Sequence, residues 1–194
     1  MGYDIEKLID IFTIFSQNKQ DLDKLRIAKL LYFIDKTHLR KYGKVVLGDK
    51  YYRMNYGPVP SLTFDLLNEL FDPEFGFYIK NKKIKKNILY TYLEVIGSYQ
   101  LKLKKTSNFE ALSISEIEVI NEVLNELGSL KTGDLIDLSH EDATYKKTRE
   151  NKEIDYCLFL EGLPADEKKL ISGLLKIDAE NQKYVDSLEN GCYT

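Results

Sequence analysis

Residues 21–41 read DLDKLRIAKLLYFIDKTHLRK, and their apolar side chains recur at helical spacing on two faces at once. A helix that is apolar over more than half of its circumference is typical of the centre of a helical domain, with neighbours on both sides. Asp21 or Asp23 is expected to cap its first turn, and Gly43 is expected to end it. The sequence therefore predicts a central buried helix whose two faces consist of Leu25, Ala28, Leu31, Tyr32 and Leu39, and of Ile27, Leu30 and Ile34.

One stripe of this helix is polar and basic. Side chains in such a stripe usually lie in solvent, so we expect a solvated face there. A role in recognition is the alternative. The stripe consists of Arg26, Lys29, Lys36 and Arg40.

Further helices are expected before and after the central one, since apolar residues recur at intervals of three and four. Several have start signals in the sequence: Asp4, Ser61 and Thr132 are candidate caps, and Ser113 with Glu116 forms a capping box. The predicted helices cover residues 4–17, 62–71, 113–127, 133–139, a short stretch around 144–150, and a long final segment that begins at Pro164.

Residues 75–105 have a different character, being rich in Phe, Tyr, Ile and Val with partial alternation. This pattern favours two or three antiparallel strands, with turns at Asn81 and at Gly97–Ser98. The predicted fold is therefore α+β and mainly α, built around the central buried helix with a small antiparallel β-sheet or hairpin. We expect one domain over residues 1–160, with a β insertion near 75–105, followed by a C-terminal helical extension over 161–194.

The charge of the chain is divided unevenly. Residues 1–106 hold 19 Lys and Arg against 12 Asp and Glu, whereas residues 107–194 hold 9 against 19. Such a division indicates either a binding face on one half or two halves that attract each other. Lysines gather at 80–86 and 102–105. They either shield strand edges, which we favour, or contact nucleic acid as a basic hairpin over 80–105.

Catalytic patterns are missing from the sequence. The chain has two histidines, and the run Ser139-His140-Glu141-Asp142 cannot face inward as a triad because its members are consecutive. His38 is expected to be a hydrogen-bonded core residue, and His140 to lie at a helix end. Cys157 and Cys192 have no metal-type spacing, and no phosphate-binding or dinucleotide-binding loop occurs. We therefore expect no enzyme, no metal and no cofactor.

The chain is expected to be cytoplasmic. Acidic residues stand near its N-terminus where a secretion signal needs basic ones, and no segment is long and apolar enough for a membrane span.

The segment YYRMNYGPVPS, residues 51–61, is the least ordinary stretch of the sequence. Gly57 permits backbone angles closed to other residues, while Pro58 and Pro60 fix φ and remove donors. The segment is therefore stiff and extended. It acts either as a wedge beside the central helix or as a preordered surface for a partner, and both roles together are compatible with its chemistry.

This region resembles the signature of the SocA-like antitoxin family, also called the Panacea domain. The similarity covers roughly residues 3–150, and its second part is the helix pattern that ends at Ser139, His140 and Glu141. Tyr145 stands where the family often has a tryptophan. The first part of the similarity consists of Lys24, Leu25, Lys29, Leu30, Leu31, Tyr32, Phe33, Tyr42, Gly43, Asp49, Tyr56, Gly57, Pro58 and Val59.

The resemblance implies a non-enzymatic, bacterial or phage-associated antitoxin that binds and neutralises a cognate toxin. It further implies a role as a proteolytic adaptor, which delivers the toxin to a Clp-type protease. Nucleic-acid binding or autoregulation is the alternative function, and the oligomeric state is left open. The residues we expect to contact the partner are Tyr52, Tyr56, Gly57, Pro58 and Val59, together with Arg26, Lys29 and His140.

Overall fold

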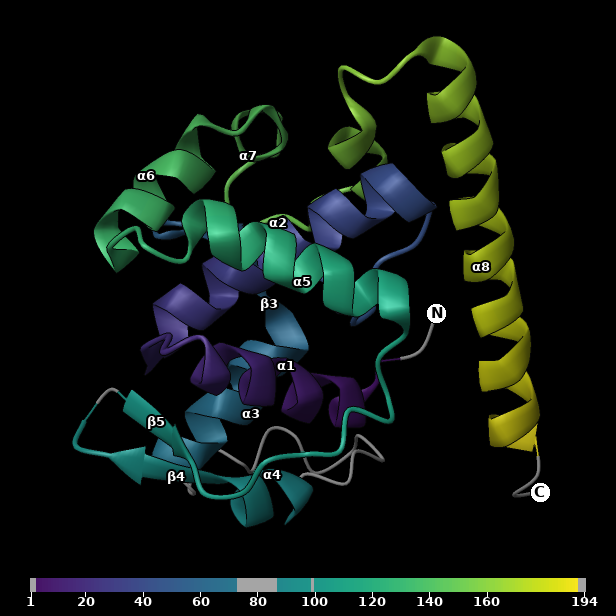
Figure 1. Cartoon of the computed structure of the whole chain (residues 1–194). Coiled ribbons are helices and arrows are strands. Elements are labelled where there is room, and N and C mark those ends of the chain that lie inside the picture. Colours follow the sequence, from purple (N-terminus) through teal and green to yellow (C-terminus); the bar gives the residue numbers. More distant parts are fainter. Residues whose placement is uncertain (1–2, 73–86, 99, 192–194) are drawn as a thin grey trace.

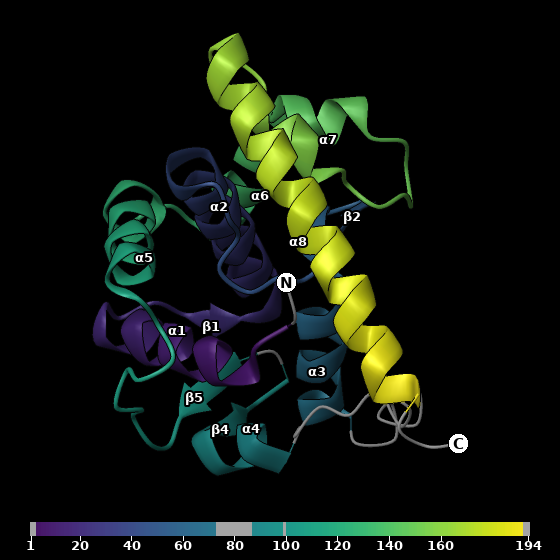
Figure 2. The same cartoon turned by 90° about the vertical axis from the view of Figure 1, so that its right-hand side faces the viewer.

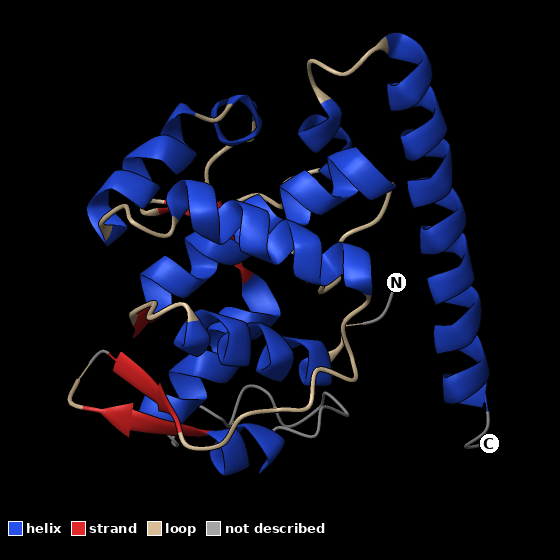
Figure 3. Cartoon of the chain, viewed as in Figure 1, coloured by secondary structure: helices blue, strands red, loops and turns tan. Residues whose placement is uncertain are grey.

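The structure is a computed structural model of the chain, and it describes residues 3–72, 87–98 and 100–191 (Figure 1). The fold is α+β and mainly α, as predicted, with two small antiparallel sheets among the helices (Figure 3). In chain order the elements are α1 (Ile5–Gln17), β1 (Leu22–Asp23), α2 (Lys24–Tyr42), β2 (Tyr51–Met54), β3 (Gly57–Pro60), α3 (Ser61–Phe71), α4 (Asn87–Tyr92), β4 (Leu93–Ile96), β5 (Gln100–Leu103), α5 (Ile114–Leu127), α6 (Thr132–Glu141), α7 (Ala143–Lys147), the 3₁₀ helix η2 (Tyr156–Leu160) and α8 (Ala165–Gly191).

Helix α2 is the predicted central helix. It contacts α3, α5, α6, β3 and η2, so that both of its apolar faces are covered. Asp23 caps it by accepting a hydrogen bond from the Arg26 amide at 2.9 Å, and Gly43 ends it with a φ of +75°. One face of α2 joins the larger core formed with α1, α3 and α5. The other face joins a second core around Tyr32, Tyr51 and Phe159.

The expectation of a solvated stripe on α2 is wrong for Arg26 and Lys29. Arg26 is 5% exposed and Lys29 is fully buried. Arg26 donates to two carbonyl oxygens in the turn after α5, and Arg40 donates to two carbonyl oxygens at η2. Lys36 pairs with the carboxylate of Asp142. The stripe is polar because its long cationic side chains reach carbonyl oxygens at the ends of neighbouring helices. These oxygens have no hydrogen-bond donor within their own helix.

The sheet near residues 93–103 confirms the predicted hairpin. Strands β4 and β5 pair antiparallel around a turn at residues 97–98, and β5 also pairs with β1, so that the order is β1-β5-β4. Residues 87–92 form helix α4 instead of a strand, which corrects the prediction. Leu89 is buried there and Ile88 and Tyr92 pack against the core, a spacing that suits a helical turn. Asn81 and the lysines of 80–86 lie outside the described residues.

The segment 51–60 is a β-hairpin of β2 and β3, in which Tyr52 faces Val59 and Arg53 faces Pro58. Two prolines fit here because β3 is an edge strand, where a missing donor is tolerated. The other edge of β2 bonds to residues 151–154: the Arg53 amide donates to the Lys152 carbonyl, and the Ile154 amide donates to the Tyr51 carbonyl.

Two of the predicted caps, at Ser61 and Thr132, are not formed. Ser61 makes no cap on α3. The buried carboxylate of Asp49 accepts from the amides of Leu62 and Thr63 at 3.0 and 2.7 Å. Thr132 is the first residue of α6, and its hydroxyl donates to the Asp23 carboxylate at 2.8 Å. The cap at Asp4 and the capping box at Ser113 are present as predicted.

The chain ends in the long helix α8, which runs along one side of the body (Figure 2). Ile171 of α8 is buried in the second core, and Leu175 packs beside it. Among the described residues, no helix combines the length and apolar character needed to cross a membrane.

Candidate functional site

The ammonium group of Lys29 lies inside the protein against the hairpin. Its Nζ donates to the carbonyl oxygen of Pro58 at 2.8 Å. Burial lowers its pKa from 10.5 to about 7, because a charged amine is poorly solvated in the interior. A buried polar group with a hydrogen bond in place holds its neighbour in one position. Lys29 therefore anchors β3 to the central helix.

Gly57 lies directly against this anchor. Its φ is +90°, which L side chains rarely adopt. A Cβ at this position would lie 2.3 Å from the Ser139 Oγ and 2.8 Å from the Lys29 Cε. Ser139 is fully buried, and its hydroxyl donates to the Ile136 carbonyl at 2.7 Å. Helix α2, strand β3 and helix α6 thus meet at one point where only glycine fits.

A stack of three side chains attaches the hairpin to α6 and α7. The His140 ring stacks on Tyr145 with centroids 4.7 Å apart and planes 28° apart. The guanidinium of Arg53 lies over the Tyr145 ring, 4.6 Å from its centroid. The Tyr145 hydroxyl also donates to the carbonyl oxygen of Met54 at 2.9 Å. Tyr145 thus joins α7 to the end of β2, a role that its place in the sequence did not predict.

The outward side of the hairpin is open to solvent. Tyr56 lies in the turn and is 64% exposed. Tyr52 and Val59 are half-buried and directly opposite each other on the two strands. A hollow of about 170 Å³ lies beside them, lined by Tyr52, Met54, Val59, Ser61, Phe64 and Asp65. We call Tyr52, Met54, Tyr56, Val59 and Phe64 the hairpin face.

The structure divides the residues that we expected to contact a partner into two groups. Tyr52, Tyr56 and Val59 belong to the hairpin face, and His140 is half-buried in the stack beside it. The others are buried beneath the hairpin or, in the case of Arg26, near the turn that follows α5. These interior residues are Gly57, Pro58, Lys29 and Arg26.

Sequence reasoning missed the structural role of a second buried ionisable group, Asp35. Its carboxylate accepts from the amides of Val46 and Leu47 at 2.6 and 3.2 Å, and from the Tyr51 hydroxyl at 2.8 Å. Burial raises the pKa of Asp35 to about 6, although these hydrogen bonds oppose the shift. The available signal was an aspartate on an otherwise apolar face of α2. Asp35 holds the segment that leads into β2.

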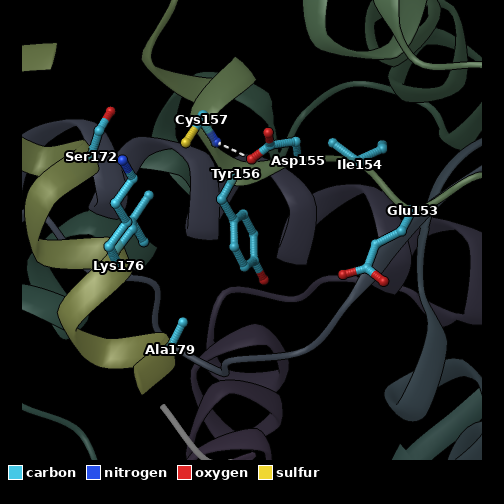
Figure 4. A pocket seen from close by; sticks show the side chains of 9 residues that line it. Glu153, Ile154, Asp155, Tyr156, Cys157, Ser172, Lys176 and Ala179 are labelled. Carbon is cyan, nitrogen blue, oxygen red and sulfur yellow. Dashed lines mark hydrogen bonds between the residues drawn. The ribbon is translucent and has the colours of Figure 1, made fainter. Parts of the chain in front are cut away.

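A groove lies between α8 and the segment 153–157 (Figure 4). It has a volume of about 460 Å³, and Cys157 and Lys176 are among the residues that line it. Burial raises the pKa of the Cys157 thiol, which opposes formation of a reactive thiolate. Across the described ranges, no group of three His, Cys, Asp or Glu residues has metal-binding geometry.

The described lysines of the basic hairpin have partners within the sheet region. Lys102 pairs with Glu94 at 3.5 Å, Lys104 donates to the Tyr90 carbonyl, and Lys105 lies 5.6 Å from the centroid of the Tyr92 ring. These contacts agree with lysines that shield the strands of the hairpin rather than with a surface prepared for phosphates.

The comparisons with known proteins identify the family. The model of the antitoxin SocA-like, Panacea domain matches residues 27–146, more than half of the chain. The chain therefore belongs to the SocA-like Panacea family. The match begins within α2 and ends in α7, so it includes Lys29, Gly57, Ser139 and Tyr145. Membership supports a general, non-enzymatic role in a toxin–antitoxin system. No curated protein and no solved structure matched the chain.

Proposed function

We propose that this chain is the antitoxin of a toxin–antitoxin pair and neutralises its toxin by direct binding through the hairpin face. One observation carries the proposal. In the interior, Lys29, Gly57 and Ser139 fix the hairpin in one position. The side chains that this hairpin turns outward include the aromatic rings of Tyr52 and Tyr56.

A fixed hairpin suits recognition because a surface that is already ordered loses little conformational entropy on binding. Tyrosine suits it too, since its ring supplies apolar area with few rotatable bonds while its hydroxyl keeps the surface soluble. The hollow next to Tyr52 and Val59 is large enough to receive one apolar side chain of the toxin. Interfaces commonly draw most of their binding energy from such an anchored side chain.

The proposal is one of binding without catalysis. His38 is buried in the fold, with Nδ1 2.7 Å from the Lys44 carbonyl, and burial lowers its pKa. His140 is stacked on Tyr145, and the Cys157 thiol has a raised pKa. His38 and His140 make contacts that stabilise the fold. The raised pKa of the Cys157 thiol disfavours a nucleophilic thiolate.

The test is co-expression with the product of the adjacent reading frame. The expected result is growth arrest by that product alone, rescue by this chain, and recovery of a stable complex. A Tyr52→Ala, Tyr56→Ala double variant should lose rescue and complex formation while keeping a wild-type unfolding midpoint. Tyr90→Ala is the matched control, because Tyr90 is 39% exposed on the distant helix α4.

Rescue and complex formation by the double variant at wild-type levels would show that the hairpin face is not the binding site. A neighbouring product that is harmless, or toxic but not rescued, would overturn the antitoxin role itself.

Delivery of the toxin to a Clp-type protease is a separate proposal. It rests on the function implied by the family and requires a surface other than the hairpin face, which the toxin would cover. The toxin's half-life after arrest of protein synthesis should shorten when antitoxin and protease are both present. An equal half-life with and without the protease would remove the adaptor role and leave neutralisation by binding intact.

A further inference from the structure

Helix α8 carries a second, largely exposed apolar stripe outside the second core, and part of it, at Leu170 and Leu174, lines a hollow with residues 40–43 of the body. Its inner stripe, with Ile171 and Leu175, packs into the second core. The outer stripe includes Leu170, 66% exposed, and Ile177, 55% exposed. Leu174 is 42% exposed and Tyr184 is 66% exposed. Burying side chains of this size stabilises an association, so an exposed row of them along one helix indicates a contact surface.

The spacing of the outer stripe is that of a coiled coil. Its members are separated by four, three, four and three residues, which places them at alternating d and a positions of a heptad. At about 100° per residue, the stripe lies roughly 120° around the helix from Ile171 and Leu175. A second helix can therefore approach the stripe from a side other than the one packed in the second core. We call this stripe the α8 seam: Leu170, Leu174, Ile177, Asn181 and Tyr184.

Asn181 identifies the occupant of the seam. It stands at an a position between apolar neighbours, and its side chain is exposed. An amide buried in an apolar seam requires a hydrogen-bonding partner at the same level. A parallel, in-register copy of the same helix supplies one, namely its own Asn181. A single asparagine at an a position favours two strands and one register.

The charges flanking the seam agree with this pairing. Asp178 occupies an e position, and Asp166 and Glu180 occupy g positions. In a parallel pair, each g position faces the e position of the next heptad, and no acid of one helix then faces an acid of the other. In an antiparallel pair each a position faces a d position, so Asn181 meets an apolar side chain such as Leu170 or Ile177 and its amide lacks a partner, which favours the parallel arrangement.

The seam also has room for close approach. Leu170, Leu174 and Ile177 border an open hollow of about 410 Å³, and Gly173 lies at its edge. From residue 170 to 184 the seam runs about 22 Å at 1.5 Å per residue. Two free peptides of this length would associate weakly, since each must first fold. Here α8 is already helical against the body, so dimerisation does not have to offset the free-energy cost of forming the helix.

We propose that the protein forms a two-stranded, parallel homodimer through the α8 seam. This inference rests on α8 alone and not on the antitoxin role, and it leaves the hairpin face of each copy unused.

Sedimentation of the full chain over a wide concentration range tests the proposal. The mass should rise from 22.6 kDa towards about twice that value. Ile177→Glu should raise the dissociation constant at least about tenfold, which corresponds to about 1.4 kcal/mol. Ile114→Glu is the matched control, because Ile114 is a helical residue that is 87% exposed on α5. A monomer at every concentration, a trimer, or equal effects of the two substitutions would overturn the dimer.

Cross-linking tests the orientation and the register. In a chain with Cys157 and Cys192 replaced by serine, Asn181→Cys should form an intermolecular disulfide under mild oxidation. Lys183→Cys, an exposed position on the other side of α8, should not. Equal cross-linking at both positions, or none at residue 181 in a sample shown to be dimeric, would overturn the parallel register. Asn181→Leu should tighten association and admit assemblies larger than two.

Discussion

Gly57 and Lys29 show how single residues fix the hairpin. The glycine brings the backbone of β3 against Ser139, and the lysine uses the space beside it to reach the Pro58 carbonyl. Neither of these contacts is visible in the local sequence. A glycine before a proline is typical of a turn, and a lysine on a polar stripe is typical of solvent. Their roles depend on contacts with residues 29 and 82 positions away in the chain, which the local pattern does not reveal.

Gly57→Ala is expected to destabilise the protein more than Gly162→Ala. Both glycines have positive φ, +90° and +81°, so both substitutions carry a backbone cost of about 1–2 kcal/mol. Only Gly57 has neighbours within 4 Å of a new Cβ, and the overlap with Ser139 adds a further cost of about 1–3 kcal/mol. Urea unfolding of the two variants measures the difference. Equal losses would mean that the close approach is not needed.

Lys29 is expected to make stability depend on pH above neutrality. Its pKa is about 7 in the folded protein and near 10.5 in the unfolded chain. Between these values the unfolded state binds the extra proton, so the free energy of unfolding rises with pH by up to about 1.4 kcal/mol per unit. Below pH 7, Lys29 is protonated in both the folded and the unfolded state. The full free-energy cost of burying its charge is then present.

The measurement compares urea unfolding of the wild-type protein and Lys29→Met from pH 7 to 10. The gain in stability on raising the pH should be larger for the wild type than for the variant. Parallel curves would show that Lys29 stays charged in the folded state.

At the scale of elements, the sequence predicted most helices and failed where an element depends on distant residues. Helices α1, α2 and α5 were predicted with their caps, because both the apolar spacing and the capping residue are local. Helix α4 was taken for a strand, since aromatic and branched residues favour both a strand and a short buried helix. The pairing of β1 with β5 and the connection of β2 to residues 151–154 have no local signal.

The candidate site was predicted in part. The stiffness of the 51–61 segment follows from its glycine and prolines, and it is therefore a local property that the sequence alone predicts. Which side chains of the segment face outward is set by the strand register, in which Tyr52 and Val59 share a face while Pro58 meets Lys29. The burial of Lys29 and Arg26 was missed for the same reason.

The start of α3 offers a test at this scale. Asp49→Ala should lower the free energy of unfolding by about 2 kcal/mol or more, because it leaves the amides of Leu62 and Thr63 without their acceptor. Ser61→Ala should change it by no more than about 0.5 kcal/mol, since Ser61 makes no cap. If denaturant unfolding showed a larger loss of stability for Ser61→Ala than for Asp49→Ala, Ser61 would be the residue that caps α3.

At the scale of the whole molecule, the uneven charge of the sequence becomes a set of contacts between its two halves. Lysines of the first half pair with acids of the second, at Lys7–Glu116 and Lys50–Glu153 among others. The alternative of two halves that attract each other, left open by the sequence, is the one that the fold displays. The family match stops at residue 146, yet the second core continues through η2 into α8.

Ile171→Ala tests whether α8 is an integral part of this core. Ile171 is 7% exposed and packs in the cluster that contains Tyr32 and Phe159. Its truncation should cost about 2–4 kcal/mol, whereas Ile114→Ala, at a residue 87% exposed, should cost no more than about 0.5 kcal/mol. Denaturant unfolding at low protein concentration measures both. A negligible loss for Ile171→Ala would make α8 a detachable appendage.

In the hairpin, the residues that fix its conformation and the residues of the proposed binding face are neighbours in the chain. Gly57 and Pro58 face the interior, while Tyr56 and Val59, one position to either side, face solvent. If the hairpin face binds the toxin as proposed, its outward side chains can be exchanged one at a time while the inward residues keep the hairpin in the same conformation.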